Sequence, residues 1–215
     1  MQKRVKHRYN SGIKQKIINH ISENINIYFR VLLIFIIGIC IGIAIVNQLP
    51  ETGLQDINEY IETSINVLKS RSEISKIQIL KSSLFKNIIV VFIIWFFGLT
   101  LIGSFVLYFI TLSIGITFGY TLAAIMTSFT FIQGVLFFLT AMLLQNVINI
   151  PSIIFLITQG IKSHKEFAIK QNTSLKYILA KYSAYSFLVM ILLIIASLIE
   201  VYVSGNLIYT IVKYL

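Results

Sequence analysis

Long apolar runs separated by short polar segments dominate the chain, and their lengths match those of membrane-crossing helices. The first run covers residues 31–46, follows Tyr28 and Phe29, and ends just before Pro50. Because a helix rises about 1.5 Å per residue, this run and its flanking aromatic residues just cross a bilayer. A cleaved signal peptide is the competing interpretation, but residues 1–30 precede the run and no small-x-small cleavage pattern follows it. We interpret it as a retained span.

A second apolar region, residues 87–161, contains no Asp, Glu, Lys or Arg. At roughly 20–25 residues per crossing, such a region holds three spans. We place these at 88–110, 112–129 and 132–157, and a last span at 183–203. The pattern predicts an all-α, polytopic membrane helix bundle of about five transmembrane helices, with residues 31–215 forming a single membrane domain.

The polar segment between the first two expected spans, residues 47–87, carries its own periodicity. Its apolar residues recur at steps of three and four, a spacing typical of an amphipathic helix. They are Leu54, Ile57, Ile61, Ile65 and Leu68. Such a helix either lies on the outer leaflet or on its own bundle, or presents a docking face to an extracytoplasmic partner. The five residues are therefore candidates for partner docking.

Composition excludes a soluble domain, and the placement of charge predicts the orientation. Only 12% of residues are charged and 57% are hydrophobic, whereas soluble domains carry about a quarter charged residues. The net charge of +10 is concentrated in the basic segment 1–30 and in the segment 159–182. The positive-inside rule places both in the cytoplasm, the second as a lysine-rich loop. Five spans then put residues 47–87 and the C-terminus outside.

The same basic segments indicate anionic membrane lipid as a partner. No groove-reading motif is found, so we expect no nucleic acid.

Groups that catalysis requires are missing from the expected spans. The three histidines, His7, His20 and His164, fall in the expected cytoplasmic segments, and the one aspartate, Asp56, falls in the outer segment. No zinc-protease, serine-hydrolase or phosphate-binding motif occurs. We expect a protein that is not an enzyme, with no catalytic residue, no metal site and no cofactor.

The fourth expected span contains an unusual group of polar residues, Gln145, Asn146 and Asn149, followed by Pro151. Carboxamides in hydrocarbon need partners, and a proline leaves the carbonyl of Val147 without its helical donor. Three interpretations remain open: contacts between helices combined with a kink, a solute or ion site, and a contact with a partner helix. Glu200, the one acid inside an expected span, is either an interfacial anchor or a buried hydrogen-bonding partner for another helix, Gln145 or Asn149.

Glycines are spaced for close packing of helices. Gly38 and Gly42 in the first span, and Gly115 and Gly119 in the third, form small-x-x-x-small pairs. Gly98 and Gly103 in the second span are candidates for the same role.

The order of these features resembles the stage II sporulation protein M family over nearly the whole chain. Phe85-Lys86-Asn87 enters a span that contains Gly98 and Ile102-Gly103, and Gly115 and Gly119 follow. Then come Gln145-Asn146 five residues before Pro151, a lysine-rich segment, and a last span ending at Glu200-Val201-Tyr202.

The resemblance implies a non-enzymatic scaffold of the peptidoglycan-remodelling complex that drives engulfment of the forespore at the sporulation septum. It also implies two wall hydrolases as partners, stage II sporulation proteins P and D. The alternative function is a permease-like membrane subunit of a small transporter or channel, which the carboxamides of the fourth span favour.

Overall fold

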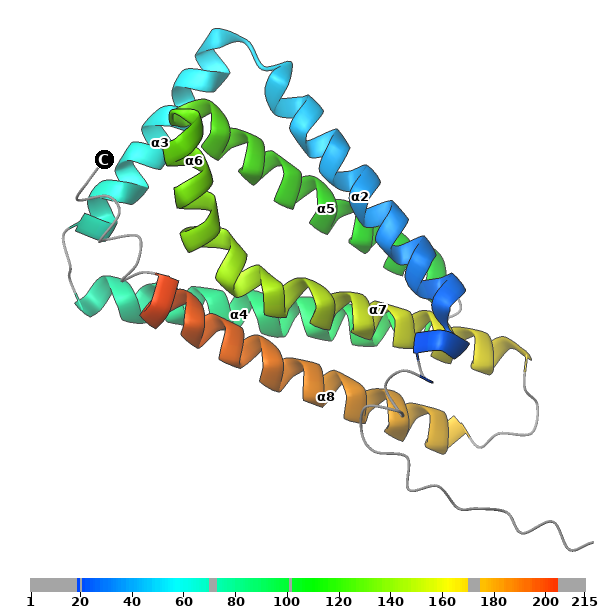
Figure 1. The fold of residues 1–215 in the computed structure, drawn as a ribbon. Helices are drawn as coiled ribbons and strands as arrows, with labels where there is room; N and C mark the ends of the chain where they lie inside the picture. The colour runs from blue at the N-terminus through cyan, green and yellow to red at the C-terminus, as the bar shows by residue number, and fades with distance from the viewer. Residues whose placement is uncertain (1–18, 20, 70–72, 101, 170–174, 205–215) are drawn as a thin grey trace, which may run out of the picture.

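The computed structural model describes residues 19, 21–69, 73–100, 102–169 and 175–204, which form helices and short connections without a strand (Figure 1). The elements are α2 (Ile25–Asn47), α3 (Glu51–Lys69), α4 (Glu73–Gly98), α5 (Gly103–Ser128), α6 (Phe131–Phe138), the π-helix η1 (Leu139–Leu143), α7 (Leu144–Ile169), α8 (Leu175–Ile199) and the π-helix η2 (Glu200–Ser204). The predicted all-α membrane bundle is confirmed.

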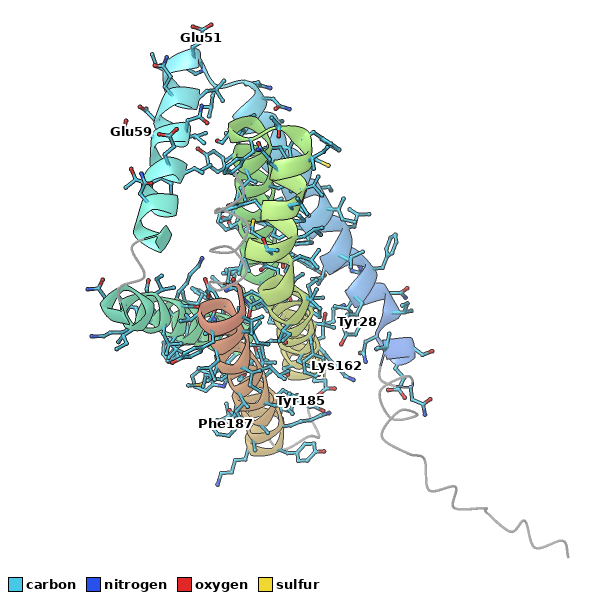
Figure 2. The ribbon with its side chains drawn as sticks, turned by 60° about the vertical axis from the view of Figure 1, so that its left-hand side comes forward. Tyr28, Glu51, Glu59, Lys162, Tyr185 and Phe187 are labelled. Carbon is cyan, nitrogen blue, oxygen red and sulfur yellow. The ribbon has the colours of Figure 1, made fainter. Side chains whose placement is uncertain are left out.

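Four helices of the described chain are long and apolar enough to cross a membrane. They are Ile25–Asn47, Ile77–Gly98, Gly103–Ser128 and Lys176–Val203. Large apolar side chains on these helices are exposed, among them Phe92, Phe105 and Phe187. Figure 2 shows Phe187 pointing away from the bundle. Hydrocarbon solvates such side chains as well as a protein core does. The chain is therefore a multi-pass membrane protein.

A seam of four glycines joins α2 to α5. A Cβ added at Gly38 would lie 3.0 Å from the Cα of Gly115, and one at Gly119 would lie 2.8 Å from the Cα of Ile39. A Cβ at Gly42 would collide with the carbonyl oxygen of Ile116. Because the missing side chains let the two backbones touch, this seam allows the closest helix approach in the described bundle.

Hydrogen bonds join α4 to α8 along much of their length. Near one end, the hydroxyl of Tyr182 donates to the carbonyl of Ile94 at 2.8 Å, and Trp95 Nε1 donates to Ser183 Oγ at 3.0 Å. Tyr182 is fully buried, and its ring occupies the space that Gly98 leaves open. Further along the pair, Asn87, Ser83, Ser197 and Glu200 continue the series of bonds.

These pairings fix the direction of each helix. Gly38 faces Gly115 and Gly42 faces Gly119, so α2 and α5 run parallel, whereas the bonds of α4 with α8 join antiparallel helices. The chain consequently runs back and forth five times, along α2, α4, α5, the joined α6–η1–α7 and α8 (Figure 1). The start of α2 and the turn before Gly103 lie at one end, and α3 and η2 lie at the other.

The turn between the second and third passes was predicted in the wrong place. The sequence suggested spans 88–110 and 112–129, but α5 is one helix from Gly103 to Ser128, and the turn lies at 99–102. Thr111, at the expected turn, is 1% exposed, and its hydroxyl donates to the carbonyl of Leu107. A uniformly apolar region has no polar residues to mark a turn, and the bracketing Gly98 and Gly103 were interpreted as packing residues instead.

Three further boundaries differ because helices continue beyond the apolar runs. α2 begins at Ile25 rather than residue 31, and the predicted outer segment 47–87 holds both α3 and the first half of α4. The predicted loop 159–182 is mostly the end of α7 and the start of α8, with residues 170–174 outside the described part. A lysine within a helix can keep its aliphatic stem in lipid while its ammonium group reaches the interface. The lysines therefore did not mark the helix ends.

The fourth predicted span, 132–157, is formed by three successive elements: α6, η1 and part of α7. It is not among the four helices that are long and apolar enough to cross a membrane. Its polar carboxamides lower the mean hydropathy of α7. Of the five expected crossings, four correspond to these apolar helices, and the crossing formed by α6, η1 and α7 stays a prediction.

The amphipathic segment forms α3, which packs against α5. Leu54, Ile57 and Ile61 are half-buried, and the hydroxyl of Ser128 donates to Asn58 Oδ1 at 2.5 Å. The apolar stripe is therefore turned at least partly toward the bundle, as in the first of the two interpretations above. The side chains of Ile65 and Leu68, also expected in the stripe, lie outside the described residues.

Replacing one glycine of the seam tests the packing of α2 on α5. We expect Gly115→Ala to destabilise the bundle by about 1–3 kcal/mol, because the new methyl group meets backbone, which cannot move aside. Thermal unfolding in detergent, followed by size-exclusion chromatography, measures the change. Gly53→Ala on α3 is the matched control, because there the methyl group meets only the Leu49 side chain at 3.4 Å. Equal melting temperatures for the two variants would contradict a tight seam.

Single cysteines test the orientation of the two ends. In a Cys40→Ala background, we expect a membrane-impermeant maleimide to label Glu59→Cys in intact protoplasts and Lys176→Cys only after lysis. Both side chains are exposed, and they lie at opposite ends of the bundle. The reverse labelling pattern would invert the orientation that the positive charges predict.

Candidate functional site

A cavity of about 930 Å³ lies between α4, α5 and α7, where the paired helices α2 and α5 diverge from the rest of the bundle (Figure 1). Ligand sites typically measure about 300–1,000 Å³. Its polar lining consists of Gln78, Ser82, Ser83, Lys86, Asn87, Ser113, Thr117, Thr121, Gln145, Asn146, Asn149 and Glu200. Its apolar lining includes Val90, Ile93, Phe109, Ile110, Ile114, Phe118, Ile150 and Ile153.

The polarity of the lining changes along the helices. On α4 the lining from Gln78 to Asn87 is polar except for Ile79, and it is apolar from Val90 to Ile93. On α7 it changes from carboxamides to isoleucines after Asn149. Both changes run away from the end that carries α3. The cavity is therefore amphiphilic, with its polar part toward α3 and its apolar part toward the opposite end.

Glu200 closes one side of the polar part and links three helices. Its carboxylate accepts a 2.7 Å hydrogen bond from Gln145 Nε2 of α7 and another from the Ser83 hydroxyl of α4. A carboxylate at membrane depth costs about 2.5–3.5 kcal/mol at midplane and less near the interface, and such bonds offset that cost. The interpretation of Glu200 as a hydrogen-bonding partner of Gln145 therefore agrees with the geometry.

Ser197 and Asn87 extend this cluster with further hydrogen bonds. Asn87 Nδ2 donates to Ser197 Oγ at 2.9 Å and to the carbonyl of Leu193 at 3.3 Å. Ser83 Oγ lies 3.0 Å from Ser197 Oγ. The carboxylate is thus positioned by side chains that are themselves hydrogen-bonded.

The other two carboxamides of α7 behave differently from Gln145. Asn146 Nδ2 donates to the carbonyl of Met142, one turn back in its own chain, at 2.9 Å. Asn149 is 7% exposed, and its Oδ1 has no hydrogen-bond partner among the described residues. The carboxamides predicted to act as one group therefore have three roles: a bond between helices, a bond within the chain, and an unpaired group on the cavity wall.

The path of the chain changes direction at η1, between α6 and α7 (Figure 1). η1 packs against η2, so two π-helical turns meet beside the bond between Gln145 and Glu200. Such turns replace the regular helical bonding and are frequent at functional sites. Pro151 lies within α7 and is exposed, and the kink expected there stays a prediction.

Sequence reasoning missed the α4 half of the site. Ser83, Lys86 and Asn87 were assigned to the outer segment, so their polarity needed no partner there. A detectable pattern was present: Ser83 and Asn87 are four residues apart, and Ser197 and Glu200 are three apart, so each pair shares a helix face.

The chemistry available in the cavity is hydrogen bonding with one carboxylate and one ammonium group. Within the described ranges, no three His, Cys, Asp or Glu side chains come together as metal ligands. The site therefore offers donors and acceptors for a neutral or weakly charged ligand beside an apolar wall.

The fold and cavity define a polytopic α-helical membrane protein with an amphiphilic cavity between its helices. The family model described as Stage II sporulation protein M matches residues 31–205. The chain belongs to this family and is a sporulation-related membrane protein, as its resemblance predicted. No curated protein and no solved structure matches the chain.

Changing Glu200 tests whether it holds α7 to α4. We expect Glu200→Leu to destabilise the protein by about 1–3 kcal/mol, because the Gln145 and Ser83 donors lose their acceptor. Glu200→Gln keeps an acceptor oxygen and retains part of that stability. Thermal unfolding in detergent measures both, with Leu198→Ala, on an exposed position of α8, as the control. A Glu200→Leu protein as stable as the control would show that the cluster contributes nothing to the bundle.

Proposed function

We propose that this protein is a non-enzymatic scaffold of the peptidoglycan-remodelling complex that drives forespore engulfment. It holds two wall hydrolases, stage II sporulation proteins P and D, at the sporulation septum. The observation that carries the proposal is the family match, which extends from the first span to η2. A scaffold needs a stable bundle and an accessible surface on the wall side rather than reacting groups.

The exposed face of α3 is the surface we propose for partner docking. The predicted docking residues Leu54, Ile57 and Ile61 are half-buried, so a partner meets the polar side of this helix instead. Tyr60 is 76% exposed there, and Glu51 and Glu59 point away from the bundle (Figure 2). An aromatic side chain among carboxylates fits a hydrolase surface that presents basic residues around an apolar pocket. The polar side of α3 thus replaces the apolar stripe as the candidate docking surface.

Recovery of the hydrolases tests this role. We expect the double variant Glu59→Lys, Tyr60→Ala to recover several-fold less of proteins P and D after cross-linking and affinity purification from sporulating cells. Lys176→Glu, a charge reversal at the opposite end of the bundle, is the matched control and recovers them normally. Protein abundance in the membrane must be equal for all variants.

The possible outcomes test α3 as the docking surface and the scaffold function independently of each other. Normal recovery by the α3 variant, at normal abundance, would remove α3 as the docking surface. Failure of the unmodified protein to recover either hydrolase would refute the scaffold proposal itself.

A permease-like subunit of a small transporter or channel is the second candidate, and the cavity between α4, α5 and α7 is what favours it. Such a subunit works with a cytoplasmic ATPase that contacts the lysine-bearing ends of α7 and α8. The same purification distinguishes the two functions. Recovery of an ATPase without wall hydrolases would support the transporter.

A further inference from the structure

The scaffold function gives no role to the cavity, although its walls combine a hydrogen-bonding part with an apolar part. We propose that this cavity binds one membrane lipid, with the acyl chain between α4, α5 and α7 and the headgroup junction at Asn149.

The unpaired group is Asn149. Its side chain is more than nine-tenths buried, lines the cavity, and has a carboxamide oxygen without a partner among the described residues. Leaving a buried acceptor unpaired is unfavourable. The unpaired atom accepts a hydrogen bond, so it complements a hydroxyl donor such as those of a phosphatidylglycerol headgroup.

The gradient of polarity indicates an amphiphile rather than a small polar solute. The wall beyond Asn149 is mostly apolar, with Ile93, Phe109 and Ile150 among its side chains, and the hydroxyl of Ser113 also lines it. A sugar or an ion would leave the apolar side chains without a suitable partner, whereas an acyl chain packs against them. Bulk lipid solvates an acyl chain equally well, so the polar contacts at Asn149 provide the selectivity.

The length of the cavity accommodates a headgroup junction and part of an acyl chain. From Gln78 to Ile93 the lining of α4 spans roughly 22 Å at 1.5 Å per residue. The stretch from Gln78 to Asn87, roughly 14 Å of this length, is mostly polar and lies toward α3, where Lys86 is available to a phosphate group. Glu200 lies in the same part but is already hydrogen-bonded to Gln145 and Ser83.

Photo-crosslinking of the full-length purified protein tests the proposal. The protein is placed in nanodiscs of phosphatidylethanolamine and phosphatidylglycerol that include a minor fraction of phosphatidylglycerol with a diazirine near the end of one tail. After illumination, mass spectrometry maps the labelled residues. We expect labelling of Ile93, Phe109 and Ile150 to exceed, by several-fold, labelling of Phe92 and Phe187, which are exposed and do not line the cavity.

Two variants give the assay its specificity. Thr117→Phe places a ring in the cavity from an exposed position of α5, and Asn149→Leu removes the unpaired carboxamide. We expect each to lower cavity labelling several-fold without lowering the melting temperature, because neither breaks a bond between helices. Val147→Phe is the matched control and leaves labelling unchanged, because Val147 is 60% exposed and does not line the cavity. If Thr117→Phe fails to fold, Asn149→Leu decides the test.

Three results would overturn the proposal: cavity labelling no greater than labelling of Phe92 and Phe187, labelling confined to the polar part near Gln78, and labelling that both variants leave unchanged. The assay uses purified protein without partners. Its result is therefore independent of the scaffold function.

Discussion

Helices in a membrane gain little by burying apolar side chains against one another, because lipid tails solvate leucine as well as a neighbouring helix does. The bundle must therefore be held by close backbone packing and by hydrogen bonds between helices. This protein uses the two mainly in different places. Glycines join α2 to α5, whereas hydrogen bonds join α4 to α7 and α8. One further bond, between Ser104 Oγ and His164 Nδ1 at 2.8 Å, joins α5 to α7. The cavity lies where these two groups of helices diverge.

This division explains why the polar side chains that bind other helices gather on the α4 and α7 walls of the cavity. Each of the bonds among Ser83, Asn87, Ser197 and Glu200 contributes about 0.6 kcal/mol if it resembles typical bonds in membranes. α5 contributes hydroxyls as well, but Ser113, Thr117 and Thr121 all donate to carbonyls of their own helix one turn earlier. They make the wall polar without binding α5 to α4 or α7. The two groups of helices consequently meet across the cavity through few specific bonds.

The sequence was sufficient for the fold class and for the glycine seam, because long uncharged runs and the spacing of Gly38 and Gly42 have one plain physical meaning in a membrane. It was insufficient for the turn at 99–102, since a uniformly apolar region carries no periodicity that distinguishes one helix from two. Gln145 and Glu200 were identified as a possible pair. Their partner Ser83 was not, because helix α4 begins well before its apolar run, and residues there were judged to be outside the membrane.

The pairing of early helices with late ones determines when the protein can complete its structure during synthesis. Asn87 and its partner Ser197 are separated by 110 residues. At about 5–20 residues per second, α4 waits roughly 5–20 s for the helix that satisfies its polar face. The seam of α2 with α5 closes earlier, once Ser128 has been added. A nascent chain therefore holds one finished helix pair beside an exposed polar helix, and during that interval it depends on the insertion machinery to shield Asn87 from lipid.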